Sequence, residues 1–296
     1  MKNILMIMNP NSGTKKANKV LTDILILFNQ YGYLTNVCMT SKNGDAADYV
    51  KYHHHKSDLI VCVGGDGTLN QVVSAMIESE CKIPLGYIPT GSTNDFATGM
   101  KINKNVIDAA KDIMTGNVQY IDVGKFNERH FCYIASCGLF TKVSYNTSQE
   151  FKNLFGHLAY ILAGVKDIAS VKSQHLKIEY NDKVIEDDFI FAAVCNSTSV
   201  GGILTLNPDF VNLNDGLFEL LLVKMPKNIL ELNSIVLALN TKDYSTDMIT
   251  FGSVSSAKIY AEDSPDWSID GEYMKGCKEI EMKAISDAIK VIVPID

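Results

Sequence analysis

The first part of the chain alternates short, continuous hydrophobic runs with longer stretches whose hydrophobic positions recur at helical spacing. The short runs predict buried strands, and the longer stretches predict amphipathic helices. Repeated strand–helix–strand units predict a mostly parallel sheet with helices on both faces. The predicted strands cover residues 3–8, 34–39, 59–63 and 85–89, and the predicted helices cover residues 15–30, 44–55 and 68–79.

The pattern changes after residue 122, where strand-like segments of alternating character, separated by turn signals, dominate. This texture predicts a mainly β sandwich or barrel with a few helices. We therefore predict two domains, residues 1–122 and 123–285, with a last strand at about residues 286–296 that returns to the first domain. The predicted strands cover residues 129–136, 175–180, 184–196, 217–224, 257–261 and 279–282, and the helices cover residues 152–170 and 228–239.

Composition narrows the class of protein. Hydrophobic residues make up 46% and charged residues 21% of the 296 residues, as in globular proteins with real cores. We expect neither an export signal nor a transmembrane segment, because no hydrophobic run approaches the roughly 18–20 residues that span a bilayer. Seven scattered cysteines without a C-x-x-C pair indicate reduced thiols in a cytoplasmic protein. The net charge of −7 argues against a nucleic-acid partner.

The strongest local motif is Gly64-Gly65-Asp66-Gly67-Thr68, which stands between a predicted strand and a predicted helix. Glycines let backbone N–H groups close around phosphate oxygens, and the helix N-terminus adds partial positive charge. An aspartate in such a loop suits a phosphate site only when Mg²⁺ or water lies between them. A tight turn that needs glycine is the structural alternative for this motif alone.

Two further loops follow predicted strands of the same sheet, at residues 9–13 and 89–96. Loops at the carboxyl ends of parallel strands line one crevice, so three loops of small polar residues together predict a nucleotide site. Ser12 or Thr93 taken singly could be a helix cap. The chain has no G-x-x-x-x-G-K-[ST] motif and no G-x-G-x-x-G motif at a strand end, which excludes P-loop and dinucleotide-binding proteins of the usual kind.

With these three segments in this order, the chain resembles the catalytic domain of diacylglycerol kinases, a family that includes sphingosine, ceramide and bacterial soluble lipid kinases. The resemblance extends to residues 212–217 and to Ile269-Asp270-Gly271-Glu272. The Gly-Gly-Asp-Gly loop also occurs in NAD kinases and phosphofructokinases, so the discriminating pieces are Gly91-Ser92-Thr93-Asn94-Asp95-Phe96 and the late Asp-Gly-Glu.

The resemblance implies ATP as co-substrate and Mg²⁺ as its metal, with Asp66 and Asp95 organising the ion and its waters. It implies a further structural Mg²⁺ held by Asp215 and by backbone carbonyls at Asn212 and Leu217, where a hairpin turn is an equally good interpretation of Asp215-Gly216. The residues implied to contact ATP are Asn9, Pro10, Asn11, Ser12, Gly13, Thr40, Gly64, Gly65, Asp66, Gly67, Thr68, Leu69, Asn70 and Ser92. Gln71 stands where relatives often have glutamate.

The Asp270-Gly271-Glu272 segment has the residue types that accept a proton from an alcohol while Mg²⁺ spreads the transferred charge. The resemblance points to Glu272 as the proton acceptor, with Asp270 as its partner or as the base itself. A surface turn is the structural alternative. We therefore predict three catalytic residues: Asp66, Asp270 and Glu272.

The resemblance implies a lipid kinase that phosphorylates diacylglycerol or a related lipid and associates peripherally with the membrane. The identity of the lipid, the mode of membrane docking and the oligomeric state stay open, with a homodimer as one option. A soluble-substrate kinase, above all an NAD kinase, is the alternative enzyme. A lipid or nucleotide sensor without catalysis is the alternative outside enzymes, although five acidic residues retained at the motif positions argue against it.

Overall fold

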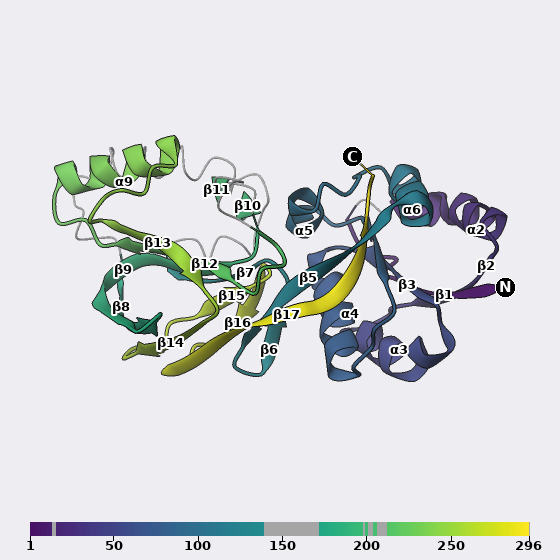
Figure 1. Cartoon of the computed structure of the whole chain (residues 1–296), viewed down its shortest axis with the longest axis horizontal. Coiled ribbons are helices and arrows are strands. Elements are labelled where there is room, and N and C mark those ends of the chain that lie inside the picture. Colours follow the sequence, from purple (N-terminus) through teal and green to yellow (C-terminus); the bar gives the residue numbers. More distant parts are fainter. Residues whose placement is uncertain (14–15, 139–171, 198, 201–203, 206–211, 296) are drawn as a thin grey trace. The chain divides into compact units, whose positions relative to one another are not determined.

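The computed structural model describes residues 1–13, 16–138, 172–197, 199–200, 204–205 and 212–295. The residues form two compact units (Figure 1). Unit 1 comprises Met1–Val123 and Ser286–Asp296, and unit 2 comprises Gly124–Ile285. The long strand β17, Glu279–Val293, contributes residues to both units.

Unit 1 is an α/β domain around a parallel sheet in the order β4-β3-β1-β2. The end of β17 pairs with β4 in parallel through Val291 and Leu85. The strands are β1 Lys2–Met8, β2 Tyr33–Met39, β3 Leu59–Gly64 and β4 Leu85–Pro89. The helices are α1 Lys16–Lys19, α2 Leu21–Gln30, α3 Asp45–His53, α4 Asp66–Glu78, α5 Asp95–Gly99 and α6 Val106–Thr115, with the 3-10 helix η1 at His54–Lys56.

Helices cover the two faces of this sheet (Figure 1). On one face, Ile24 and Phe28 of α2 and Ala110 of α6 pack with alternate residues of β1 and β3. Helices α3 and α4 lie on the other face, so both sides of the central strands are buried. Strands buried on both faces read as continuous hydrophobic runs, which is why the sequence pattern predicted a parallel sheet.

Two helix boundaries of unit 1 differ from the sequence prediction. The predicted helix over residues 15–30 is divided at Val20 into α1 and α2. Helix α4 begins at Asp66 rather than Thr68, so Asp66 and Gly67 form its first turn. The acidic residue of the glycine-rich motif therefore lies at a helix N-terminus, where the dipole stabilises negative charge. Helix α6 was not predicted, and the short helix α5 has Asn94 rather than Thr93 at its N-cap.

Unit 2 is an antiparallel β-rich domain that contains the strand path β16-β15-β7-β9-β8-β14-β17, with β12 between β9 and β13. Its long strand β9 pairs with β8 through residues 183–189 and with β7 and β12 through later residues. The strands are β5 Asn117–Phe126 (which starts in unit 1), β6 Arg129–Phe131, β7 Ile134–Gly138, β8 Gln174–Tyr180, β9 Lys183–Cys195, β10 Ser199–Val200, β11 Leu204–Thr205, β12 Phe218–Lys224, β13 Ile249–Val254, β14 Ser256–Ala261, β15 Trp267–Ile269 and β16 Glu272–Met274.

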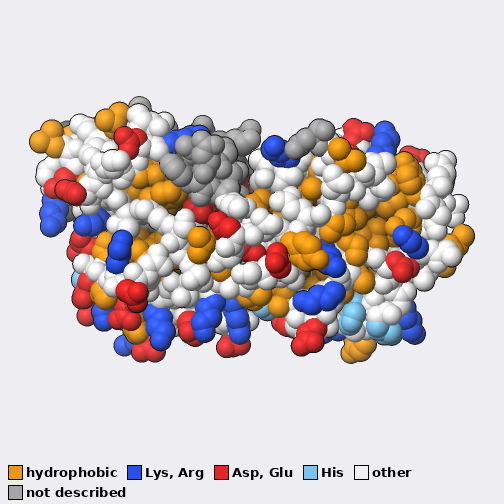
Figure 2. All heavy atoms as spheres, viewed as in Figure 1, with side chains coloured by type: hydrophobic (Ala, Val, Ile, Leu, Met, Phe, Trp, Pro, Cys, Tyr) orange, Lys and Arg blue, Asp and Glu red, His pale blue; other side chains and the backbone are white. Residues whose placement is uncertain are grey.

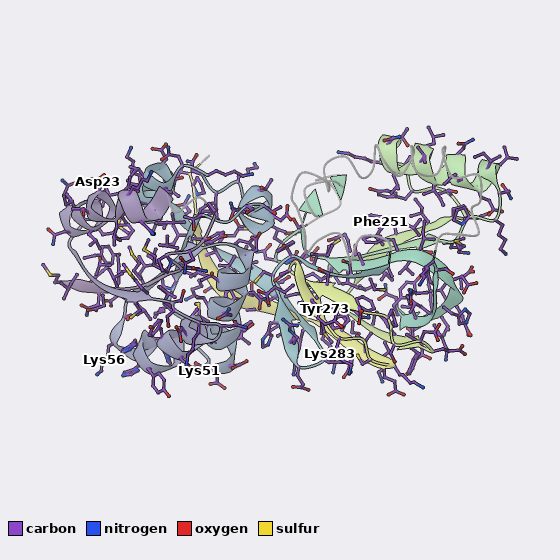
Figure 3. All side chains as sticks on the ribbon, turned by 180° about the vertical axis from the view of Figure 1, so that it is seen from behind. Asp23, Lys51, Lys56, Phe251, Tyr273 and Lys283 are labelled. Atoms are coloured by element: carbon purple, nitrogen blue, oxygen red, sulfur yellow. The ribbon has the colours of Figure 1, made fainter. Side chains whose placement is uncertain are left out.

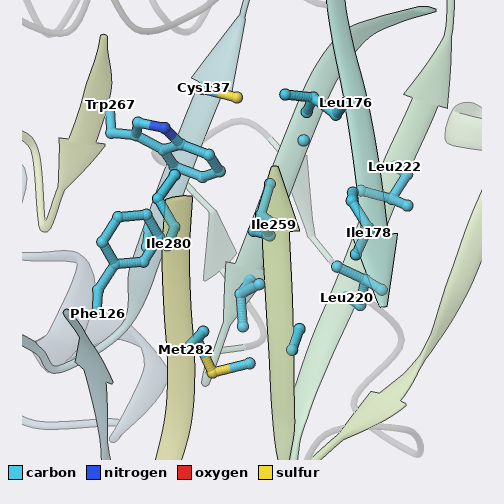
Figure 4. Close-up of a cluster of buried hydrophobic side chains, with 14 of the residues drawn as sticks. Phe126, Cys137, Leu176, Ile178, Leu220, Leu222, Ile259, Trp267, Ile280 and Met282 are labelled. Atoms are coloured by element: carbon cyan, nitrogen blue, oxygen red, sulfur yellow. The ribbon is translucent and has the colours of Figure 1, made fainter. Parts of the chain in front are cut away.

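The core of unit 2 is built from alternate residues of these strands (Figure 4). Trp267 is fully buried there, with its ring 4.8 Å from that of Phe126. Ile178, Ile259 and Leu222 extend the same cluster. The one helix of unit 2 within the described residues is α9, Ile229–Thr241, capped by Asn228, whose Oδ1 accepts from Leu230 N and Glu231 N.

Two strand boundaries of unit 2 correct the prediction. The segment predicted as one strand over residues 129–136 is interrupted at Cys132 and Tyr133, which separate β6 from β7. The strands predicted at residues 279–282 and 286–296 are parts of the single strand β17. The hairpin of β15 and β16 and the strands β5 and β13 were not predicted, and the helix predicted over residues 152–170 lies outside the described residues.

Within the described residues, no helix is both long and hydrophobic enough to cross a bilayer. All seven cysteines are free thiols. Burial raises the pKa of the Cys62 and Cys137 thiols well above its usual range, which makes them poor nucleophiles and poor metal ligands at neutral pH.

Candidate functional site

The three polar loops predicted from the sequence meet at the carboxyl ends of β1, β3 and β4. The backbones of the second and third loops touch, because a Cβ added to Gly91 would lie 2.6 Å from Gly65 Cα. A Cβ added to Gly13 in the first loop would collide with the Thr90 carbonyl oxygen. Gly13 also has a φ of +52°, a backbone conformation that favours glycine. Small residues at these three positions are therefore required for the loops to close together.

The third loop is held by the side chain of Asn94 and by a backbone hydrogen bond from Thr90 N to Gly64 O at 2.8 Å. Asn94 adopts a left-handed conformation with a φ of 54°. Its Oδ1 accepts from Gly91 N at 2.9 Å, and its Nδ2 donates to Gly91 O at 2.9 Å. Tyr87 Oη lies 3.2 Å from Gly64 O and 3.4 Å from Asn94 Oδ1, so it connects the second and third loops. These uncharged side chains fix the path of the third loop.

The first loop is joined to helix α4 by side-chain contacts. Asn9 Nδ2 donates to Thr68 Oγ1 at 3.3 Å, and Asn9 Oδ1 accepts from Asn11 N at 3.0 Å. Asn18 Nδ2 donates to the Pro10 carbonyl oxygen at 2.9 Å. Thr40 follows β2, and its N–H donates to Met8 O at 2.9 Å, which brings Thr40 to the same edge of the sheet.

The two aspartates of the predicted metal site are adjacent. Asp95 N donates to Asp66 Oδ2 at 3.3 Å, so the first turns of α4 and α5 are linked through a carboxylate. Asp95 is buried, whereas Asp66 is partly exposed. The side chain of Ser92 is exposed, and that of Leu69 is buried in the core, so Leu69 can offer a ligand its backbone alone.

Gln71, which stands where relatives often have a charged glutamate, makes two hydrogen bonds within unit 1. Its Oε1 accepts from Gly44 N at 3.0 Å, and its Nε2 donates to Asn43 Oδ1 at 2.7 Å. The amide therefore ties α4 to the loop that precedes α3. A glutamate here could accept the first of these hydrogen bonds but could not donate the second.

In unit 2, Asp270 and Gly271 form the turn of the β15–β16 hairpin. Both residues have positive φ, of 49° and 80°, as a two-residue type I′ turn requires. The Asp270 carboxylate is 3% exposed and points away from solvent. Its oxygens accept from Cys132 N at 2.6 Å, Tyr133 N at 3.0 Å and Ile134 N at 3.1 Å. Asp270 thus binds the break between β6 and β7.

Glu272 lies two residues further on and has a different environment. Its side chain is 50% exposed, and its Oε2 lies 3.6 Å from Nη2 of Arg129. Nη1 of the same guanidinium donates to the Tyr273 carbonyl oxygen at 3.2 Å. The hairpin therefore presents one carboxylate that is buried in backbone hydrogen bonds and one that can reach a ligand.

The segment Asn212–Leu217 forms a turn that leads into β12. Asp215 Oδ1 accepts from Leu217 N at 3.0 Å, and Asn212 Oδ1 lies 3.4 Å from Asn214 N. The neighbouring Glu219 is 2% exposed, and its Oε2 has no hydrogen-bond partner. Burial raises the pKa of the Glu219 carboxyl to about 8, and the charge of Asp215 adds to the rise. The side chains of Asn212, Asp215 and Glu219 thus lie at or next to this turn.

The residues identified from the sequence could hold phosphate and a hard cation. The backbones of Gly13, Gly65 and Gly91 lie so close together that an added Cβ would collide, and the buried Thr90 Oγ1 of the third loop has no hydrogen-bond partner. Among the described residues, no three His, Cys, Asp or Glu side chains are grouped to hold a metal ion. A cation here would therefore rely on ligand phosphates, water and carbonyl oxygens as well as carboxylates.

Sequence reasoning missed four residues of these sites. Asn94 was within the discriminating motif but was not assigned a contact, although asparagine tolerates the left-handed conformation. Arg129, Glu219 and Tyr87 lie on strands, where the sequence pattern gives no sign of a function. The signal for Arg129 is its rarity, since it is the single arginine of the chain.

Comparison with known protein families matches both units. Residues 3–126 match the model of the diacylglycerol kinase catalytic domain. Residues 134–293 match the model described as the YegS C-terminal NAD kinase beta sandwich-like domain.

Curated proteins and solved structures agree with these models. A diacylglycerol kinase of Bacillus subtilis is 33% identical over 275 residues, which cover 92% of this chain and 90% of that protein. One from Staphylococcus epidermidis is 32% identical over 270 residues, or 90% and 85% of the two chains. A solved diacylglycerol kinase structure from Bacillus anthracis superposes with a TM-score of 0.79 at 26% identity and covers 99% of this chain and 97% of its own. Another from that organism gives 0.82 at 24% identity, which supports the fold alone.

Proposed function

This chain belongs to the diacylglycerol kinase family and is a kinase, and from that premise we propose that it transfers the γ-phosphoryl group of ATP to the hydroxyl of diacylglycerol or a related lipid. The observation that carries the proposal is the contact of Gly13, Gly65 and Gly91 backbones at the N-terminus of α4. Loops that close without side chains leave N–H groups for phosphate oxygens. The names of the relatives support the lipid acceptor.

In this proposal the loops of unit 1 bind ATP. Backbone N–H groups of Gly67 and Thr68 face phosphate oxygens, and the hydroxyls of Ser12, Thr90 and Ser92 add donors. Asn9 holds Thr68 in place through the hydrogen bond between their side chains. The same set includes Pro10, Asn11, Gly13, Thr40, Gly64, Gly65, Leu69 and Asn70. Mg²⁺, when bound, would neutralise charge on the transferred phosphoryl group, and Asp66 and Asp95 would hold its waters.

Glu272 is the proton acceptor in this proposal. The lipid hydroxyl gives its proton to a Glu272 carboxylate oxygen while its oxygen bonds to the γ-phosphorus. The bond from that phosphorus to the bridging oxygen breaks, and ADP leaves with the electron pair. Two observations favour Glu272 over Asp270: Glu272 is half exposed, and the carboxylate of Asp270 already accepts three backbone N–H groups. Asp270 instead sets the turn that carries Glu272.

A structural Mg²⁺ at the turn of residues 212–217 is part of the proposal. The donors are the exposed Asp215 carboxylate and the carbonyl oxygens of Asn212 and Leu217, a set of hard oxygen ligands that Mg²⁺ prefers. The negative charge at this turn comes from Asp215, because burial raises the pKa of the neighbouring Glu219 carboxyl to about 8 and keeps it protonated at neutral pH. These residues fit the ion in charge and in ligand type.

We further propose peripheral membrane association through α9, because a lipid acceptor is reached at a bilayer surface. This helix is hydrophobic on its outer side as well as its inner side: Leu230 is 76% exposed and Leu237 64%. Figure 2 shows hydrophobic side chains at the outer surface over α9. The exposed Lys227 and Lys242 stand at its two ends, where they can meet anionic headgroups while the aliphatic residues enter the interface.

The test is ADP release by the purified chain with diacylglycerol, ceramide or sphingosine in mixed micelles, with and without EDTA. We expect release that depends on lipid and on Mg²⁺, and an Asp66→Ala variant that melts normally but turns over far more slowly. If ADP release does not depend on lipid, the proposal is wrong.

An NAD kinase is the second candidate, because the model matched by the second unit is described as NAD kinase-like. The same assay separates the two acceptors. ADP release that needs NAD and ignores micelles would identify the soluble acceptor, whereas tight ATP binding without transfer to any alcohol would identify a sensor.

A further inference from the structure

Arg129 places its guanidinium on the hairpin that carries Glu272. One nitrogen, Nη2, lies 3.6 Å from Glu272 Oε2, and the other, Nη1, donates to Tyr273 O at 3.2 Å. Tyr273 is half exposed on the hairpin (Figure 3). The single arginine of the chain therefore holds both a carboxylate and the backbone directly after it. A guanidinium can do this because its donors point in a fixed fork, which a lysine cannot reproduce.

The backbone that carries Arg129 is itself fixed. Strand β6 pairs with β5 through Phe126 and Arg129. At the tip of that hairpin, Asn127 Oδ1 accepts from Glu281 N at 2.8 Å, and Asn127 N donates to Glu281 O at 2.9 Å. The guanidinium thus extends from a hairpin that β17 holds in place. The position of the guanidinium is therefore set by the backbone of this hairpin as well as by the arginine side chain.

Charges join segment 129–134 and the β15–β16 hairpin in both directions. From the segment, the cation of Arg129 reaches Glu272 and the Tyr273 carbonyl. From the hairpin, the anion of Asp270 reaches three N–H groups of the segment. The two contacts lie on either side of Gly271, which leaves Glu272 as the carboxylate that is both exposed and restrained.

We propose that Arg129 is a positioning residue for the proton acceptor, and that it then faces the phosphate of the product. This inference rests on the proposed function. Before transfer, the guanidinium pairs with the ionised Glu272 and limits the rotamers of that carboxylate. Once Glu272 has taken the proton of the lipid hydroxyl, the pair has lost its anion. The new phosphate monoester forms on that same hydroxyl, so the guanidinium has a new anion within reach.

The first experiment compares Arg129→Gln and Arg129→Lys with Lys125→Gln. Lys125 is a matched control, because it lies on the same β5–β6 hairpin and forms an exposed ion pair with Glu128 at 3.8 Å. We expect Arg129→Gln to lower kcat about 10- to 100-fold with little change in KM for ATP, because a misplaced acceptor costs this order of rate. Arg129→Lys should recover little of it, and Lys125→Gln should turn over normally.

A second experiment tests whether Arg129 acts through Glu272. In a Glu272→Gln background, Arg129→Gln should lower turnover much less than it does in the wild type, because the group it positions is gone. In Arg129→Ala, added guanidinium salt at millimolar concentration should restore part of the lost turnover, and equal sodium chloride should not. Weaker inhibition of Arg129→Gln by lipid phosphate would report the product contact. A role confined to folding would produce neither the rescue nor the dependence on Glu272.

The outcomes separate this inference from the proposed function. Lipid-dependent turnover in the wild type together with near-normal kcat in Arg129→Gln would overturn the inference alone. Equal losses from Arg129→Gln in the wild-type and Glu272→Gln backgrounds would also overturn it. No lipid-dependent turnover in the wild type would remove the proposed function first.

Discussion

Neutral amide and hydroxyl groups, with one further contact to the Asp66 carboxylate, hold the candidate nucleotide loops of unit 1, whereas charged side chains hold the acidic hairpin of unit 2. Asn94, Asn9 and Tyr87 fix the loops from behind, and glycines let the backbones touch. In unit 2, Asp270 and Arg129 join the hairpin to segment 129–134. Both regions are positioned, but by interactions that respond to different perturbations.

The difference follows from what each region has to present. A phosphate site needs unused backbone N–H groups, so the loops must be held by contacts that leave those groups available. A proton acceptor needs an ionised carboxylate in one place, and a nearby cation supplies both the charge balance and the orientation. Added volume should therefore damage unit 1 most, and removed charge should damage the hairpin of unit 2 most.

The largest expected effect is that of Glu272→Gln, which removes the charge and keeps the shape. Turnover should fall about 10²- to 10⁴-fold, the usual contribution of a general base. ATP affinity and melting temperature should stay close to wild type, because the side chain is half exposed. Steady-state kinetics and a thermal melt measure both. Glu128→Gln, on an exposed side chain, is the control, and turnover of Glu272→Gln near the wild-type rate would refute the assignment.

Added volume in unit 1 comes next. Gly91→Ala puts a methyl group 2.6 Å from Gly65 Cα, so the two loops must separate. We expect kcat/KM for ATP to fall about 10²-fold, as misplacement by an ångström can cost this much. Gly252→Ala is the matched control, because a Cβ there meets nothing within 4 Å. Equal kinetics of the two variants would mean that closure of the loops does not matter.

Removal of the buried charge in unit 2 should act on stability. Asp270→Asn replaces an acceptor of three N–H groups by a side chain with one acceptor and one donor. The free energy of unfolding should fall by about 2–3 kcal/mol, since hydrogen bonds to a charged group are strong and their donors would be buried unpaired. Urea unfolding measures it. Asp266→Asn, at an exposed side chain, should lower the free energy of unfolding by less than about 1 kcal/mol. If it lowers this free energy as much as Asp270→Asn does, the buried charge of Asp270 has no special role in holding the hairpin.

The smallest expected effect is the change in the free energy of unfolding per pH unit that Glu219 causes. Burial disfavours the charged form and raises the pKa of the Glu219 carboxyl in the folded state from its usual 4.5 to about 8. Between these values the folded state holds a proton that the unfolded state has lost, so stability falls as pH rises. The expected slope is about 1.4 kcal/mol per pH unit, measured by unfolding in EDTA. Glu219→Gln should flatten this slope; an unchanged slope would assign the pH dependence elsewhere.

The sequence predicted most of unit 1 because its strands are buried on both faces and its loops carry glycine. The break of the first helix at Val20 was missed, because hydrophobic spacing continues through residues 15–30 while the backbone does not. The early start of α4 at Asp66 was missed because glycine usually marks a loop. The contact of the three loops followed from the rule that parallel strands end at one edge.

Unit 2 was less predictable because its site depends on pairings between distant residues. Nothing near Cys132 in the sequence indicates that Asp270 will interrupt the strand there. The Asp-Gly pair did suggest a turn, and the structure makes it a buried one with a structural aspartate. Trp267 of the same hairpin is a core residue that packs against Phe126.

Strand β17 determines when unit 1 can finish folding during translation. Its last residues pair with β4 of unit 1, yet they leave the ribosome after all of unit 2. N-terminal domains generally fold first during translation, but here the edge of β4 waits for Val291, which is translated after unit 2. A nascent chain stalled before β17 would carry an open sheet edge in unit 1, a natural target for chaperones. Translation of β17 is thus the event that closes unit 1.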